Sequence, residues 1–194
     1  MNTKMFCYQC EQTAGCSGCT GNAGVCGKSA KTADLQDKLT GALIGLARAC
    51  ENNPKTDNTD RIIIEGLFTT LTNVNFNDDV LEDMIAKVHA EKNRIVPDCA
   101  VCQSPCGNTS DYDVSLIWDA DEDIRSLKSL ILFGIKGIAA YAYHAMVLGY
   151  TDESVNEFFY KALAVISYNR TMEDLLAITL EVGEINLKCR EMLD

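Results

Sequence analysis

The chain has 194 residues, of which 47% are hydrophobic, and its 28 acidic residues outnumber 17 basic ones to give a formal net charge of −11. A chain of this length forms one domain or two small ones and can bury a core without covalent staples. The excess of negative charge argues against nucleic acid as a partner, because phosphate binding needs a basic surface. An anionic membrane surface is disfavoured for the same reason.

Five of the ten cysteines fall between positions 7 and 26. Thiols gathered this densely form disulfides, bind zinc or hold an iron–sulfur cluster. Disulfides belong to oxidising compartments and matter most in small domains that lack a core. The opening residues, Met1 to Phe6, are not followed by the continuous apolar stretch of a secretory signal. We therefore expect free thiols in a reducing, anaerobic cytoplasm.

The spacing of these cysteines bears on the choice between zinc and iron. Zinc usually takes two separated ligand pairs in tetrahedral geometry. Cys7 with Cys10 and Cys16 with Cys19 could supply the pairs, but only five residues separate them, and Cys26 would be left over. An iron–sulfur cluster fits better, because a C-x2-C pair lets two thiolates of one turn reach two irons while later thiolates close the other side. Zinc remains the alternative at this point.

Downstream of this segment, apolar residues recur at three- and four-residue spacing, which predicts helices. Six helices are expected: after an N-cap at Thr32, after Thr59, after Asn77, from about Asp121 to Gly149, from near Thr151, and after a capping box at Thr171–Asp174. No period-two strand pattern and no glycine-rich phosphate loop is recognised. We predict an all-α fold in which two three-helix bundles pack together. The expected division is a cluster-binding segment, 1–28, a first unit, 29–96, a connecting loop, 97–120, and a second unit, 121–194.

The segment from Asp121 to Gly149 is apolar almost all round in its second half. A membrane span would place Lys136 near its middle, at about 2.5–3.5 kcal/mol on insertion scales, and His144 would add to that cost. We therefore predict a buried central helix and no membrane partner. His89 and His144 are the only histidines. We interpret His89 as a surface or packing residue and His144 as a packing or hydrogen-bonding residue.

The break between the two halves holds Cys99, Cys102 and Cys106 in a C-x2-C-x3-C arrangement. This spacing makes them a candidate second metal site. No fourth ligand is evident nearby, so Asp98, Asp111 or a distant cysteine would have to complete the set. We favour the interpretation that the segment is a thiol-rich surface loop.

Three motifs of the N-terminal segment resemble the opening of the hybrid cluster proteins, or prismane proteins, of the hydroxylamine reductase family: MFCYQCEQT at 5–13, GC at 18–19 and GVCGK at 24–28. The resemblance implies a [4Fe–4S] cluster, as in most members, or a [2Fe–2S] cluster, as in some. The ligands that it implies are Cys7, Cys10, Cys19 and Cys26, spaced C-x2-C-x8-C-x6-C. Cys16 is then an extra thiol, either a spectator or a substitute ligand.

The resemblance also implies a fold and a reaction. Members of the family begin with two three-helix bundles behind the cluster segment and continue into α/β domains. Those later domains supply most or all of the ligands of a hybrid Fe–S–O cluster, where hydroxylamine is reduced to ammonia or nitric oxide is reduced. This sequence ends where the first domain ends, so we expect a separate cluster domain, a split-gene subunit or an engineered fragment.

The expected role is therefore electron relay to a redox partner protein or to the remaining hybrid-cluster domains, with no catalytic residue in this chain. The alternative is a structural metal-binding helical module, with zinc or an iron–sulfur cluster, that has no redox turnover. Visible absorption separates the two, since a brown protein bleached by dithionite carries iron–sulfur, whereas a colourless one with bound zinc is structural.

Replacing Cys99, Cys102 and Cys106 together by serine is expected to leave the N-terminal cluster intact, because these cysteines are remote in sequence and form an incomplete ligand set. The measurement is the visible spectrum and the iron content per chain of anaerobically purified protein. Loss of all iron from the triple variant contradicts this expectation, and a partial loss points to a second site.

Overall fold

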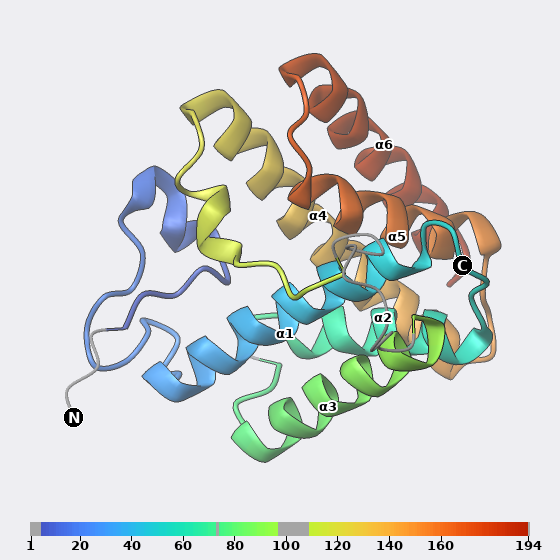
Figure 1. Cartoon of the computed structure of the whole chain (residues 1–194), viewed down its shortest axis with the longest axis horizontal. Coiled ribbons are helices and arrows are strands. Elements are labelled where there is room, and N and C mark those ends of the chain that lie inside the picture. The colour runs from blue at the N-terminus through green and yellow to red at the C-terminus, as the bar shows by residue number, and fades with distance from the viewer. Residues whose placement is uncertain (1–4, 73, 97–108, 194) are drawn as a thin grey trace, which may run out of the picture.

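The computed structural model describes residues 5–72, 74–96 and 109–193, and these form an all-α fold, as predicted (Figure 1). The helices are α1 (Ala30–Cys50), α2 (Asp57–Thr69), α3 (Asp78–Ile95), α4 (Glu122–Val147), α5 (Glu153–Ser167) and α6 (Met172–Glu191). Two short 3-10 helices, η1 (Glu11–Cys16) and η2 (Val114–Ile117), precede α1 and α4 respectively.

Side-chain caps mark where α1 and α2 begin. The N-cap of α1 is Ser29, whose hydroxyl accepts from the Thr32 amide at 3.0 Å. The N-cap of α2 is Thr56, which forms a capping box with Thr59. Both predicted starts, at Thr32 and at Thr59, are therefore wrong by three residues. In each case two hydroxyl residues stand three positions apart, and the first one is the residue that can accept from the free amide of the first turn.

The other long helices begin close to their predicted starts. Asn77 and Thr171 cap α3 and α6 by accepting from amides of the first turn, as expected. Asp152 caps α5, one residue after the predicted start at Thr151, and accepts from the Ser154 amide at 2.9 Å. A carboxylate at this position also interacts favourably with the helix dipole.

One continuous hydrophobic core joins all six helices. Leu43 of α1, Leu67 of α2 and Phe159 of α5 are fully buried in it, as is Ile135 of α4. α1 packs against α5 as well as against α3, and α2 packs against α4. Helices from both sides of the predicted division therefore bury one another, while the division into two three-helix units itself stays a prediction.

The chain returns across α1 at a glycine before it enters η2. The Tyr112 amide donates to the Gly41 carbonyl at 3.0 Å. A Cβ atom at Gly41 would lie 2.1 Å from the Tyr112 carbonyl oxygen, so no other residue fits there. This crossing places Trp118 beside Tyr8, with ring centroids 4.8 Å apart. The close contact at α1 thus helps to hold the N-terminal segment against the bundle.

Among the described residues, α4 is the one helix long and apolar enough to cross a membrane, by length and composition only. This is weak evidence for a span, because the core helix of a soluble protein passes the same test. Lys128 and Lys136 of α4 are 7% and 3% exposed, and each has a hydrogen-bond partner inside the protein. These buried cations favour the interpretation of α4 as a core helix.

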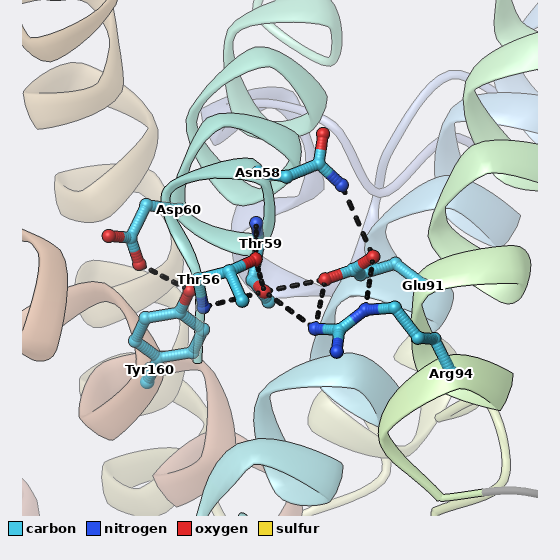
Figure 2. Close-up of polar contacts among 7 residues, drawn as sticks. All are labelled: Thr56, Asn58, Thr59, Asp60, Glu91, Arg94 and Tyr160. Carbon is cyan, nitrogen blue, oxygen red and sulfur yellow. Dashed lines mark hydrogen bonds and ion pairs between the residues drawn. The ribbon is translucent and has the colours of Figure 1, made fainter. Parts of the chain in front are cut away.

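A polar network fixes α2 against α3 and α5, and Figure 2 shows its side chains. Glu91 of α3 is 5% exposed and accepts from the Thr59 hydroxyl at 2.5 Å. Arg94 donates to both carboxylate oxygens of Glu91, at 2.8 and 3.1 Å, and these bonds hold the pKa of Glu91 below its usual range. On the other side of α2, the Tyr160 hydroxyl donates to Asp60 at 2.6 Å.

Glu91→Ala is expected to lower the free energy of unfolding by about 2 kcal/mol, because it removes charge-assisted hydrogen bonds from a buried site. Glu82→Ala on the same helix is the control, since Glu82 is exposed and pairs with exposed Lys31 at 2.9 Å. Its effect should stay within about 0.5 kcal/mol. Denaturant unfolding measures both, and equal effects of the two substitutions would contradict the role of Glu91.

The difference in unfolding free energy between wild type and Glu91→Ala should also depend on pH. The folded-state pKa of Glu91 is lowered, so its stabilisation is fully present above the ordinary pKa of a glutamate and is lost as the pH falls through the folded value. The stability difference between wild type and Glu91→Ala should therefore shrink on acidification. A difference that grows on acidification would show that the carboxylate is not the stabilising form.

Candidate metal centre

The cysteine-rich segment folds back on itself beside the N-terminal end of α1 (blue in Figure 1). An antiparallel bridge pairs Cys7 with Cys19, and Cys10 is the residue that precedes η1. The amide of Gly27 donates to the carbonyl of Gly24 at 2.8 Å, which closes a turn around Cys26. Gly27 has a φ of +92°, a conformation that glycine adopts without strain.

Backbone amides donate to two of the predicted ligand thiols. The Val25 amide bonds Cys19 Sγ at 3.4 Å, so the residue before Cys26 touches the thiol of Cys19. The Gln9 amide bonds the thiol of Cys7. Burial raises the pKa of Cys7, while this amide and nearby Lys28 act in the opposite direction. Such N–H···S bonds stabilise sulfur charge and are a feature of cluster sites.

Gly24 leaves room beside the thiol of Cys26. A Cβ atom at this position would lie 3.3 Å from Cys26 Sγ and 3.2 Å from Lys28 Cγ. Cys7 is buried, whereas Cys10, Cys19 and Cys26 are half-buried, and all four are free thiols. The segment therefore presents four unpaired sulfur donors with little side-chain bulk next to the last of them.

In the ranges that the structure describes, no three or more His, Cys, Asp or Glu side chains are grouped for one metal ion. A structural zinc ion would need four ligands around a single centre. In a [4Fe–4S] cluster each of four thiolates binds a different iron, so its ligands surround a larger body. Four free thiols on one folded segment, with amide donors to sulfur, are chemically suited to an iron–sulfur cluster.

Two buried ammonium groups lie next to the cysteine segment. Lys136 of α4 donates to the side-chain oxygen of Gln9, which lies between Cys7 and Cys10 in sequence. The amide nitrogen of Gln9 in turn donates to Asp37 of α1. Lys28, at the end of the segment, is 2% exposed. Its ammonium group donates to the side chain of Gln36, also on α1.

These contacts change the acidity of the charged groups. Burial lowers the pKa of Lys136 to about 8, although Asp37 and the thiols of Cys7 and Cys10 oppose this shift. Burial raises the pKa of Asp37 to about 7, although its hydrogen bond from Gln9 and the charge of Lys136 act against it. The site thus carries buried charge that its cysteines alone would not supply.

Sequence reasoning missed Gln9 and Lys136 as parts of this site. In the sequence, Gln9 is one of the two residues between Cys7 and Cys10 and has no predicted role. Lys136 is used there only to argue against a membrane span. The signal was a single lysine within a long apolar stretch, because a buried ammonium group must find a polar partner. Nothing in the local pattern of the sequence indicates that the partner is Gln9.

Some predicted site residues lie outside the described part of the chain. η1 ends at Cys16, but its thiol is not among the described atoms. Cys99, Cys102 and Cys106 also lie outside the described residues. The candidate second site therefore stays a prediction.

The histidines and one proposed ligand for that second site have other contacts. Asp111 shares a hydrogen bond of 2.7 Å with His89 and accepts from Lys92 at 2.7 Å. His144 is exposed, and its ring packs edge-on against Phe68 with centroids 5.7 Å apart. Both histidines thus have the surface and packing contacts expected from the sequence.

A family model and several known proteins each match almost the whole chain. The sequence matches the Prismane/CO dehydrogenase family over residues 5–194. It is 38% identical to a hydroxylamine reductase of Caldanaerobacter subterraneus over 98% of this chain and 39% of that protein. Hydroxylamine reductases of Methanocella arvoryzae and Porphyromonas gingivalis are 39% and 38% identical, over 98% and 100% of this chain and 39% of each relative. The chain spans about two fifths of the length of these curated relatives.

Serine substitution of Cys7, Cys10, Cys19 or Cys26 is expected to reduce the iron content per chain severely, because a hydroxyl is a poor substitute for a soft thiolate ligand. Cys16→Ser in the same segment is the matched control and should keep its iron. Iron analysis and visible absorption of anaerobically purified variants provide the measurement. The ligand assignment is wrong if Cys16→Ser loses the cluster while Cys19→Ser retains it.

Proposed function

The chain belongs to the Prismane/CO dehydrogenase family, and on that basis we propose that it is the iron–sulfur electron-transfer domain of a hybrid cluster protein of the hydroxylamine reductase type. The proposed cofactor is a [4Fe–4S] cluster, or a [2Fe–2S] cluster, held by Cys7, Cys10, Cys19 and Cys26. When bound, the cluster supplies reversible one-electron transfer. The observation that carries the proposal is four free thiols on one folded segment, with Cys7 bridged to Cys19.

The protein's own part is to hold and shield these thiolates. The amides of Gln9 and Val25 donate to two of the sulfurs, and nearby Lys28 opposes the rise that burial causes in the pKa of Cys7. Half-burial of Cys10, Cys19 and Cys26 limits water without closing the site to a redox partner. These features support electron uptake at a site near the surface.

We infer that the partner is a redox protein or the remaining domains of a hybrid cluster protein, in an anaerobic cytoplasm. The net charge of −11 would favour a donor with a basic docking face, because complementary charge speeds encounter. The acidic balance gives no support to a nucleic-acid or anionic-membrane partner.

We place the reduction of hydroxylamine or nitric oxide outside this chain. Cleavage of the N–O bond needs a metal with an open coordination position that can bind and polarise the substrate. A cluster with a thiolate on each iron offers no such position. His89 is engaged with Asp111, and His144 packs on Phe68, so both imidazoles have contacts of their own.

The isolated chain is expected to accept electrons without producing ammonia from hydroxylamine. The first measurement is the visible spectrum before and after dithionite, where a bleached brown colour supports the relay and a colourless zinc protein indicates a structural module. The second is ammonia formation from hydroxylamine with reduced viologen, against a blank without protein. Sustained turnover that disappears in Cys106→Ser would overturn the relay and move the chemistry to the second cysteine loop.

A further inference from the structure

The side chain of Lys136 connects the middle of α4 to the turn between two predicted cluster ligands. Lys136 is 3% exposed, and its ammonium group bonds Gln9, which lies 127 positions earlier in the chain. The backbone amide of Gln9 bonds the thiol of Cys7. Through one residue, the ammonium group of a core helix is therefore coupled to a ligand sulfur.

Both ends of the Gln9 side chain are engaged. Its oxygen accepts from Lys136, and its nitrogen donates to Asp37 of α1. This pair of contacts selects one orientation of the amide and anchors the C-x2-C turn to two helices. Lys136 is thus a positioning residue for Gln9 as well as a buried charge.

We propose that Lys136 positions the Cys7–Cys10 turn and raises the reduction potential of the cluster held there, with Asp37 as the opposing charge. This inference rests on the proposed function, because it requires a cluster that accepts an electron. The electron comes from a low-potential one-electron donor such as reduced viologen, which is oxidised as the cluster is reduced. No covalent bond of the chain forms or breaks in this step.

The sign of the effect follows from electrostatics. A thiolate-ligated cluster gains one negative charge when it is reduced. A nearby cation stabilises the reduced form more than the oxidised form, and it does so strongly where water is excluded. Lys136 and Lys28 contribute two buried ammonium groups, whereas Asp37 contributes one carboxylate. The ammonium groups should therefore outweigh the carboxylate and shift the potential upward.

α4 offers a matched control two turns away. Lys128 is also buried, at 7% exposure, but its ammonium group donates to the Tyr168 carbonyl at 3.0 Å. Burial alone lowers its pKa, and no cysteine contributes to that shift. Substituting Lys128 removes a buried ammonium group from the same helix without altering the Gln9 contact.

The experiment measures the midpoint potential and the iron content of wild type, Lys136→Gln, Lys136→Arg, Asp37→Asn and Lys128→Gln, with helical content followed by circular dichroism. Lys136→Gln should have a clearly more negative potential than wild type, and Lys136→Arg, which keeps the charge, should lie closer to wild type. Asp37→Asn should shift the potential in the positive direction. Lys128→Gln should leave the potential unchanged.

The outcomes separate the two proposals. Equal potentials in wild type and Lys136→Gln, or equal shifts in Lys136→Gln and Lys128→Gln, overturn the role of Lys136 and leave the electron relay standing. If Lys136→Gln does not fold, the potential of Asp37→Asn tests the proposal in its place. An unchanged or more negative potential in Asp37→Asn then overturns the proposal. A wild-type cluster that accepts no electron overturns both the relay and this inference.

Discussion

The organisation of this protein depends on a buried ammonium group that must find a partner. An unpaired charge in a protein interior costs several kcal/mol, so Lys136 in the middle of α4 cannot be buried without a polar contact. Its partner is Gln9, in the turn between Cys7 and Cys10. The solvation requirement of one core residue therefore ties the cysteine-rich segment to the helical bundle.

α1 is the second support of the site. In its first turns, Asp37 accepts a hydrogen bond from Gln9, and Gln36 accepts one from Lys28. Further along the helix, Leu43 is buried in the common core. The same helix thus provides polar partners to the site and packs against α3 and α5. The core and the candidate metal centre are consequently parts of one packed unit, and changes in either should be felt in the other.

This arrangement is compatible with the electron-transfer role proposed above. Thiols held by amide donors and buried cations can tolerate a change of charge with little movement, because the surrounding dipoles are already in place. Substrate reduction has a different requirement, namely an open coordination position. The proposed function divides the two tasks between this chain and further domains. The chain spans about two fifths of the length of its curated relatives.

The sequence by itself determined the all-α class and the number of long helices in the described part of the chain, because helical periodicity is a local property. The four ligand candidates came from the resemblance of the N-terminal motifs to a known family, and they stay a prediction. Sequence reasoning misplaced the starts of α1 and α2 by three residues, since Ser29 with Thr32 and Thr56 with Thr59 offer two hydroxyls at each start and only the first can cap. Tertiary structure alone decided that Lys136 bonds Gln9. A contact across 127 positions leaves no trace in local patterns, because it is selected by how the folded chain excludes water from a charge.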